Sequence, residues 1–373
     1  MTVGAALLAY AAVLGGLGSV VYRHDGWLTR APRLGATLLL AAAWSVLTAL
    51  FLAGLTLALP DTALSGGLSD LLGACILRLR AAYATPGGAA AAGAGLTLSA
   101  SIALRAGWAL LQVARVRRVE RRRQRLLVAL CGRRVAAHEA VILDQPQPAA
   151  YCVAGRASTV ILTSGTVELL TPSQLSAVLA HERAHLGAKH HRLQACAALA
   201  GRTLPELAFM RDLPHQIGRL LEMHADDLAA CTQDPETLAE ALVAVATARP
   251  AVSPSNAPSA LLAAADRDVV QRIRRLLLPP AKLSPRRRRM VRAGVATFGL
   301  LPLLVALTPA AVAANQPPVR RIQVVSTVHR NPAASRPLRS AVAQTAVDHG
   351  SNGVFAHRTG GKRNRARLAR GSR

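Results

Sequence analysis

The sequence is poor in aromatic residues, acidic residues and paired cysteines. Phe, Trp and Tyr make up 3% of the 373 residues. No helix-turn-helix or RNA-binding motif stands out, so we do not interpret the net charge of +26 as a nucleic-acid-binding surface. The five cysteines are odd in number and none has C-x-x-C spacing, which excludes a thiolate zinc cluster and a paired disulfide framework. We therefore expect free thiols and no direct nucleic-acid partner.

Long apolar runs and basic blocks alternate along the chain. Hydrophobic residues make up 51% of the sequence, and a soluble domain does not combine this share with such a charge. A multi-pass membrane protein does, because it keeps apolar and basic residues in separate segments. Apolar runs long enough to span a bilayer occur at residues 3–22, 34–59, 89–113 and 293–314. The first run has its positive charge behind it, unlike a secretory signal peptide, so we expect a retained helix.

Arginine-rich segments orient these runs. Residues 115–134 contain nine arginines and one acid, Glu120, and a second basic block at 282–292 precedes the last run. The positive-inside rule places both blocks in the cytoplasm, so the segment between them is predicted to be cytoplasmic and loop 61–88 to face outward. Arg105, inside the third run, is expected to reach toward the lipid–water boundary.

The clearest catalytic pattern is HExxH at His181–His185. The preceding TPSQ at 171–174 has the spacing of a helix start with a capping box and proline in the first turn. On the helix that follows, His181 and His185 lie one turn apart on one face. Two imidazoles placed in this way can bind Zn²⁺, and Glu182 beside them can act as a general base toward water.

A third metal ligand is available downstream, in LEMHADDLA at 221–229. Glu222 can complete a His-His-Glu site that leaves a fourth position open. Asp226, one helical turn later, can accept a hydrogen bond from the second ring nitrogen of a ligand histidine and so orient it.

His191 is a rival third ligand, because the HExxHxxGxxH motif places a histidine at this spacing. That motif needs glycine at a bend where this chain has Ala188. Without the glycine we expect the helix to continue and to carry His190 and His191 away from the metal.

A β-branched run at 159–161, bounded by turn residues, predicts a strand. Two interpretations stay open. The strand can be an exposed edge that pairs with substrate backbone, or an ordinary core strand.

These features together resemble the BlaR/MecR-type membrane metallopeptidases. The similarity consists of three spans, a basic junction, AYCVAGR at 150–156, AVLAHERAH at 177–185, EMHAD at 222–226 and a last span. In that family a cytoplasmic zinc-protease domain precedes the final transmembrane helix, and some members signal by causing loss of a transcriptional repressor. The segment 268–278 resembles a late helix of these and of HtpX-like peptidases, which implies a packing role.

The resemblance also implies roles for individual residues. His181, His185 and Glu222 would bind zinc, Glu182 would be the catalytic base, and Asp226 would orient a ligand. The β-lactam-sensing members continue into a penicillin-binding domain, whereas only 59 residues follow position 314 here, without a Ser-x-x-Lys motif. Direct β-lactam acylation is therefore not expected, and the inducing signal stays open.

We predict a mainly α fold in which an α+β zincin-like metalloprotease domain is inserted among multi-pass membrane helices. The predicted parts are a three-helix membrane domain (1–115), the cytoplasmic protease domain (116–290), a fourth transmembrane helix (293–314) and a basic tail whose composition indicates disorder (315–373).

The predicted function is zinc-dependent cleavage of a cytoplasmic protein, such as a winged-helix repressor, at the plasma membrane of a bacterium. The alternatives are an HtpX-like quality-control protease and a non-catalytic membrane receptor or scaffold that keeps zinc for folding. The expected partners are a protein substrate and the lipid bilayer. The oligomeric state and the oxyanion-stabilising residue stay open, with His215 and His224 as candidates for the latter.

Overall fold

The computed structural model describes residues 2–23, 25–58, 87–135, 139–153, 158–248, 259–279 and 283–314. Four of its helices are long and apolar enough to cross a membrane, with candidate spans at Val3–Val20, Pro32–Ala58, Gly88–Cys131 and Pro285–Leu307. The four predicted spans are therefore confirmed, and the chain is a multi-pass membrane protein. The predicted tail and residues 61–86 of the predicted outward loop lie outside the described residues.

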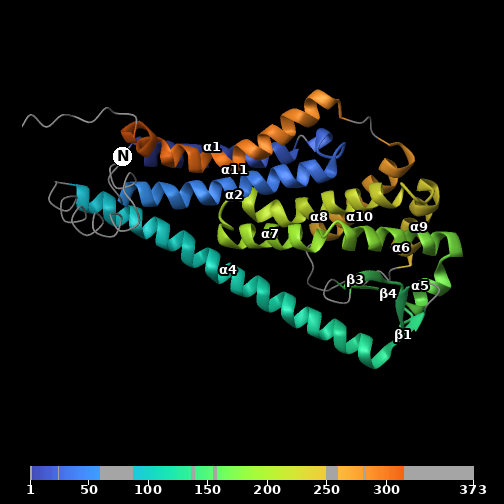
Figure 1. Ribbon diagram of the computed structural model, residues 1–373. Coiled ribbons are helices and arrows are strands. Elements are labelled where there is room, and N and C mark those ends of the chain that lie inside the picture. The colour runs from blue at the N-terminus through green and yellow to red at the C-terminus, as the bar shows by residue number, and fades with distance from the viewer. Residues whose placement is uncertain are drawn as a thin grey trace, which may run out of the picture. The chain divides into compact units, whose positions relative to one another are not determined.

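The membrane helices are α1 (Thr2–Arg23), α2 (Pro32–Ala58), α4 (Gly88–Cys131) and α11 (Pro285–Ala314), with a short helix η1 (Asp25–Trp27) between α1 and α2. Helix α2 contacts the other three, and α1, α2 and α11 lie side by side (Figure 1). Small residues let α2 and α4 approach closely, since a Cβ added at Gly54 or Gly95 would lie 2.5 Å from the carbonyl oxygen of the other glycine. Nearby, Ser99 Oγ donates to the carbonyl of Phe51 at 2.8 Å.

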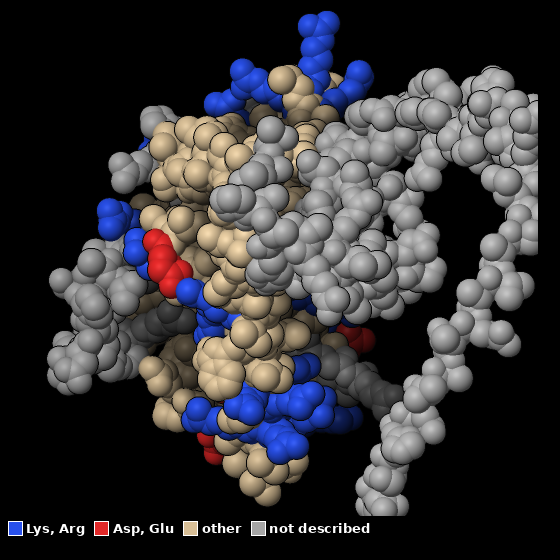
Figure 2. All heavy atoms as spheres, turned by 90° about the vertical axis from the view of Figure 1, so that its left-hand side faces the viewer, with Lys and Arg blue, Asp and Glu red and all other residues tan. Residues whose placement is uncertain are grey.

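Helix α4 runs without a break from its apolar half into its arginine-rich half, so the predicted domain boundary at 115/116 falls inside one helix. Arg105, which we expected to reach toward the lipid–water boundary, contacts protein atoms. Its Nε donates to the carbonyl of Thr203 at 2.8 Å, and its guanidinium pairs with Glu206. On the face drawn in Figure 2, Lys and Arg side chains gather in separate groups with uncharged surface between them.

In the part of the chain that the structure describes, the remaining elements are a four-stranded sheet and six helices. The strands are β1 (Gly132–Val135), β2 (Ala140–Leu143), β3 (Ala150–Val153) and β4 (Thr159–Thr163), and the helices are α5 (Ser164–Leu169), α6 (Pro172–Gly187), α7 (His190–Thr203), α8 (Ala208–Ala229), α9 (Pro235–Thr247) and α10 (Ser259–Leu277). The fold class is thus confirmed as mainly helical with a small mixed sheet.

The strand order is β1-β2-β4-β3, with β2 and β4 parallel and the other pairs antiparallel. The strand predicted at 159–161 is β4, and it lies inside the sheet with Ile161 and Leu162 fully buried. Of its two interpretations, the core strand is the correct one. The edge next to α6 belongs to β3.

Membrane helices α1, α2 and α11 share one hydrophobic core with α7 and α8. Leu7, Leu28 and Val46 of the α1–α2 hairpin belong to the same buried cluster as Phe209 and Ile217 of α8. The approach is close enough that a Cβ added at Gly18 of α1 would collide with the ring of Phe209. Helix α8 is therefore positioned by apolar packing against the α1–α2 hairpin.

Candidate metal centre

The HExxH helix, α6, begins as its sequence predicts. The Thr171 side chain accepts from the backbone N–H of Gln174, and the Gln174 side chain accepts from the backbone N–H of Thr171 at 3.1 Å, which completes the predicted capping box. The apolar face of the helix packs against β4 and α9. This leaves His181, 7% exposed, and the half-buried His185 facing α8.

Three donor atoms from α6 and α8 converge on one point. His181 Nε2 and His185 Nε2 are 3.2 Å apart, and they lie 3.4 Å and 3.5 Å from the two carboxylate oxygens of Glu222. Ligands held tetrahedrally at about 2.0–2.1 Å are separated from one another by roughly 3.3 Å. Each of the three separations is close to this distance, with one Glu222 oxygen facing each histidine, and two imidazoles with one carboxylate form a donor set that zinc favours.

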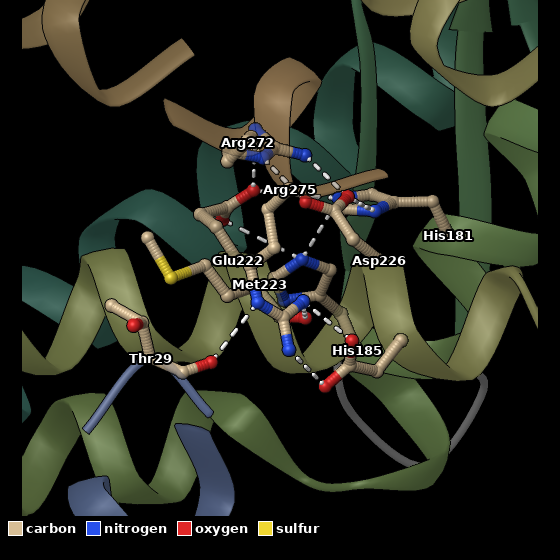
Figure 3. A network of polar contacts seen from close by, with 9 residues as sticks. Thr29, His181, His185, Glu222, Met223, Asp226, Arg272 and Arg275 are labelled. Carbon is tan, nitrogen blue, oxygen red and sulfur yellow. Dashed lines mark hydrogen bonds and ion pairs between the residues drawn. The ribbon is translucent and has the colours of Figure 1, made fainter. Parts of the chain in front are cut away.

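Asp226 contacts His181, and Arg272 contacts both Asp226 and Glu222 (Figure 3). Asp226 is 1% exposed, and its Oδ1 lies 3.0 Å from His181 Nδ1. The two atoms form an ion pair, but their geometry is not that of a hydrogen bond. Arg272 of α10 donates from Nε and Nη2 to the two oxygens of Asp226, both at 2.8 Å. Its Nη1 lies 3.1 Å from Glu222, so one guanidinium fixes both acids.

The sequence prediction missed Arg272, because only a packing role was expected for segment 268–278. The side chain is 11% exposed. An arginine on the buried side of an amphipathic helix requires an acidic partner, which is the signal that could have identified it.

The charges around the site keep its acids ionised. Burial alone raises the pKa of Glu222, but hydrogen bonds with His181 and His185 and the charge of Arg272 outweigh it and lower the pKa. The pKa of Asp226 is lowered in the same way, mainly by Arg272. Burial lowers the pKa of His181, but contacts with Asp226 and Glu222 prevail and raise it to about 9. Glu222 is therefore ionised, as a metal-binding carboxylate must be.

The chain bends directly after α6, so the prediction that the helix continues is wrong. Helix α6 ends at Gly187, and Lys189 has a φ of +55°, in the left-handed region. This conformation costs a non-glycine residue about 1–2 kcal/mol. Burial of the His190 side chain, which is 3% exposed after the bend, offsets this energy cost, while His191 remains exposed. Tertiary packing thus replaces the missing glycine.

His190 is turned back toward the site and continues a chain of imidazoles. Its Nδ1 lies 3.1 Å from Nδ1 of His185, and its Nε2 lies 2.8 Å from Nδ1 of His224 on α8. Burial and neighbouring histidines lower the pKa of His190 to about 3, and burial also lowers the pKa of His224, so both rings are neutral. The Nδ1 atoms of the two HExxH histidines thus have different partners: Asp226 for His181, and the neutral His190 for His185.

Glu182 faces a thiol that the sequence prediction did not single out. Burial raises the pKa of Glu182, and the nearby His181 and His185 only partly oppose this effect. Burial, the charge of Glu182 and a hydrogen bond between the two groups raise the pKa of the Cys152 thiol to about 12. The thiol therefore stays protonated beside Glu182. A lone cysteine has no spacing signal, so the sequence could not predict this contact.

Two cavities meet at the metal centre. One, of about 470 Å³, is bordered by Arg117, Glu120 and Arg121 of α4, and the other, of about 530 Å³, is bordered by apolar side chains of α6 and α9. Both include Cys152 of the edge strand β3, His185 and Glu222. The site is therefore open on both sides, which is what an extended polypeptide requires.

Neither candidate for the oxyanion-stabilising residue borders these cavities. His215 is 53% exposed and pairs with Asp268 at 3.3 Å. His224 contacts His190 and borders a different cavity.

Comparison with known proteins gives one match. The model of peptidase family M48 matches residues 114–326, more than half of the chain. No curated protein and no solved structure matches. The matched segment contains HExxH, the downstream acids and the last membrane helix.

Proposed function

The chain belongs to peptidase family M48, and from this premise we propose that it is a signal-transducing protease of the BlaR/MecR type. Family membership makes it a membrane zinc endopeptidase that hydrolyses peptide bonds. The proposed substrate is a cytoplasmic regulator such as a winged-helix repressor. We place the metal centre on the cytoplasmic side of a bacterial plasma membrane, because basic blocks flank it in the sequence.

The convergence of two imidazoles and a carboxylate, whose facing nitrogen and oxygen atoms lie 3.2–3.5 Å apart, carries this proposal. We assign His181, His185 and Glu222 as the zinc ligands, Glu182 as the general base and Asp226 as the residue that orients His181. When bound, zinc supplies Lewis-acid chemistry, which acidifies water and polarises a carbonyl. Glu182 accepts the proton of the attacking water and returns it to the leaving nitrogen.

The edge strand β3 supplies the binding track for the substrate backbone. It borders both cavities through Cys152 and lies beside α6. An extended peptide that pairs with this edge passes the metal centre and places its side chains alternately on either side. The apolar cavity, lined among others by Val178, Leu238 and Leu242, favours a hydrophobic side chain next to the cleaved bond.

The test is the variant Glu182→Ala, compared with Glu236→Ala, an exposed acid of α9 outside the metal centre. Both variants should retain zinc, and only Glu182→Ala should abolish cleavage, a loss of about 10²–10⁴-fold. In cells, a regulatory protein should persist with Glu182→Ala and disappear with the control once the pathway is induced. Unchanged cleavage by Glu182→Ala would refute the assigned mechanism.

The quality-control alternative has the same metal chemistry and is separated by its substrates. A single regulator that accumulates in cells with Glu182→Ala supports signalling, whereas many misfolded membrane proteins would support quality control. Membership of a metallopeptidase family speaks against the non-catalytic receptor or scaffold.

A further inference from the structure

A separate cavity of about 370 Å³ lies between the α1–α2 connection, α8, α10 and the start of α11. It shares no lining residue with the two substrate cavities. Its charged and titratable lining residues are Arg30, Arg33, His224, Asp227, Cys231, Arg275 and Arg288. Four arginines from the two ends of the described chain thus border one space.

The positive charge of this cavity is only partly balanced. Asp227 binds the guanidinium of Arg275 through both of its oxygens, and Arg275 also donates to the carbonyls of Thr29 and Met223 (Figure 3). Among the described residues, the side chains of Arg30, Arg33 and Arg288 have no hydrogen bond or ion pair. Three formal positive charges therefore face a cavity whose one acid is already engaged.

The position of the cavity along the membrane helices indicates the source of its ligand. Arg33 directly precedes the apolar run of α2, which begins at Leu34, and Leu34 itself lines the cavity. Arg288 lies in the basic start of α11, one turn before its apolar run. Residues at both places are at the level of lipid headgroups, where anionic lipids attract arginines.

The geometry points to a binding site for a phosphate-bearing anion, supplied by the headgroup of an anionic membrane lipid. Guanidinium groups bind phosphate oxygens with two parallel hydrogen bonds, and Arg30, Arg33 and Arg288 have these donors unused. Topology alone would require arginines beside the spans, but would not require them to converge on one cavity. This site does not depend on peptidase activity.

The test compares two triple variants of the full-length chain in detergent. The pocket variant is Arg30→Gln, Arg33→Gln and Arg288→Gln, which leaves Arg275 with its partners. The matched control replaces Arg286, Arg287 and Arg289, which are exposed on the same helix and do not line the cavity. Native mass spectrometry measures binding of dioleoylphosphatidylglycerol and dioleoylphosphatidylcholine, and thermal unfolding measures binding of inorganic phosphate.

Phosphatidylglycerol should bind the wild type and the control with similar affinity. It should bind the pocket variant roughly 100-fold more weakly, because each of the three arginines removed contributes to the attraction of an anionic lipid. If inorganic phosphate stabilises the wild type but not the pocket variant, and phosphatidylglycerol does not discriminate between them, the site takes soluble phosphate instead. Equal binding by wild type and pocket variant, or an equal loss in the control, overturns the site.

A second measurement uses only the wild-type chain, so it does not require a variant to fold. A photoactivatable phosphatidylglycerol in vesicles that contain the wild-type chain should label the peptides of Arg30–Leu34 and Cys231, which line the cavity. Label confined to other membrane helices overturns the site as well.

Discussion

Replacing Asp226 with asparagine should weaken zinc binding about 10- to 100-fold, because the second ring nitrogen of His181 loses its anionic partner. The change keeps the shape of the side chain and removes one charge. Arg272, 11% exposed, then stays buried with Glu222 as its remaining acidic partner. Breaking a buried pair costs about 3–5 kcal/mol, and the remaining contact with Glu222 places this case near 3 kcal/mol.

The matched control is Asp227→Asn, one residue further along α8. Asp227 also accepts both hydrogen bonds of an arginine, Arg275, but it is 41% exposed and contacts no metal ligand. Competition with a chelator measures zinc affinity, and thermal unfolding measures stability. Asp226→Asn should lower both, and Asp227→Asn only the stability, by a smaller amount. Asp226→Asn that loses stability but holds zinc as tightly as the wild type would refute an orienting role.

Three further changes test other parts of the structure. Because burial raises the pKa of Glu182 and the base must be ionised, kcat/KM should fall as pH decreases through a pKa above the ordinary 4.5; an acid limb at or below 4.5, with zinc content constant, contradicts this. His190→Leu should weaken zinc binding about 10-fold in chelator competition, and unchanged affinity would show that the imidazole chain has no orienting role. Gly18→Ala should lower the free energy of unfolding by about 1–3 kcal/mol through its collision with Phe209, whereas Gly16→Ala, with nothing within 4 Å, should not; equal thermal midpoints would contradict the packing.

Features set by local sequence were predictable. The capping box at 171–174 follows from residue types at fixed spacing, and the places of the four spans follow from long apolar runs; the structure has the capping box and four helices long and apolar enough to span a membrane. Helices α4 and α11 are longer than the runs predicted at 89–113 and 293–314, because the neighbouring arginine-rich segments are helical as well. The distant Glu222 was also proposed from its spacing to Asp226, and the structure brings its carboxylate to the two histidines of HExxH. The metal-binding and catalytic roles of these residues stay predictions.

Features set by tertiary contacts were not predictable. No glycine in the sequence marks the bend at Lys189. The bend is accompanied by a buried contact between His190 and His224, which local sequence does not reveal. Arg272 contacts Asp226, 46 residues earlier in the chain, and Glu222, which lies earlier still; at such separations no local pattern is informative. The sheet edge next to α6 is β3 rather than β4, because strand order is decided by which strands pair and not by how apolar each one is.

The shared core of the α1–α2 hairpin and α8 has a consequence for how information could cross the bilayer. Helix α8 carries Glu222, and it rests on the hairpin through Phe209 and Ile217, without an intervening linker. A tilt of the hairpin would therefore displace the Glu222 carboxylate relative to His181 and His185 on α6. For the signalling role proposed above, such a tilt would be a direct way to change the geometry of the metal site.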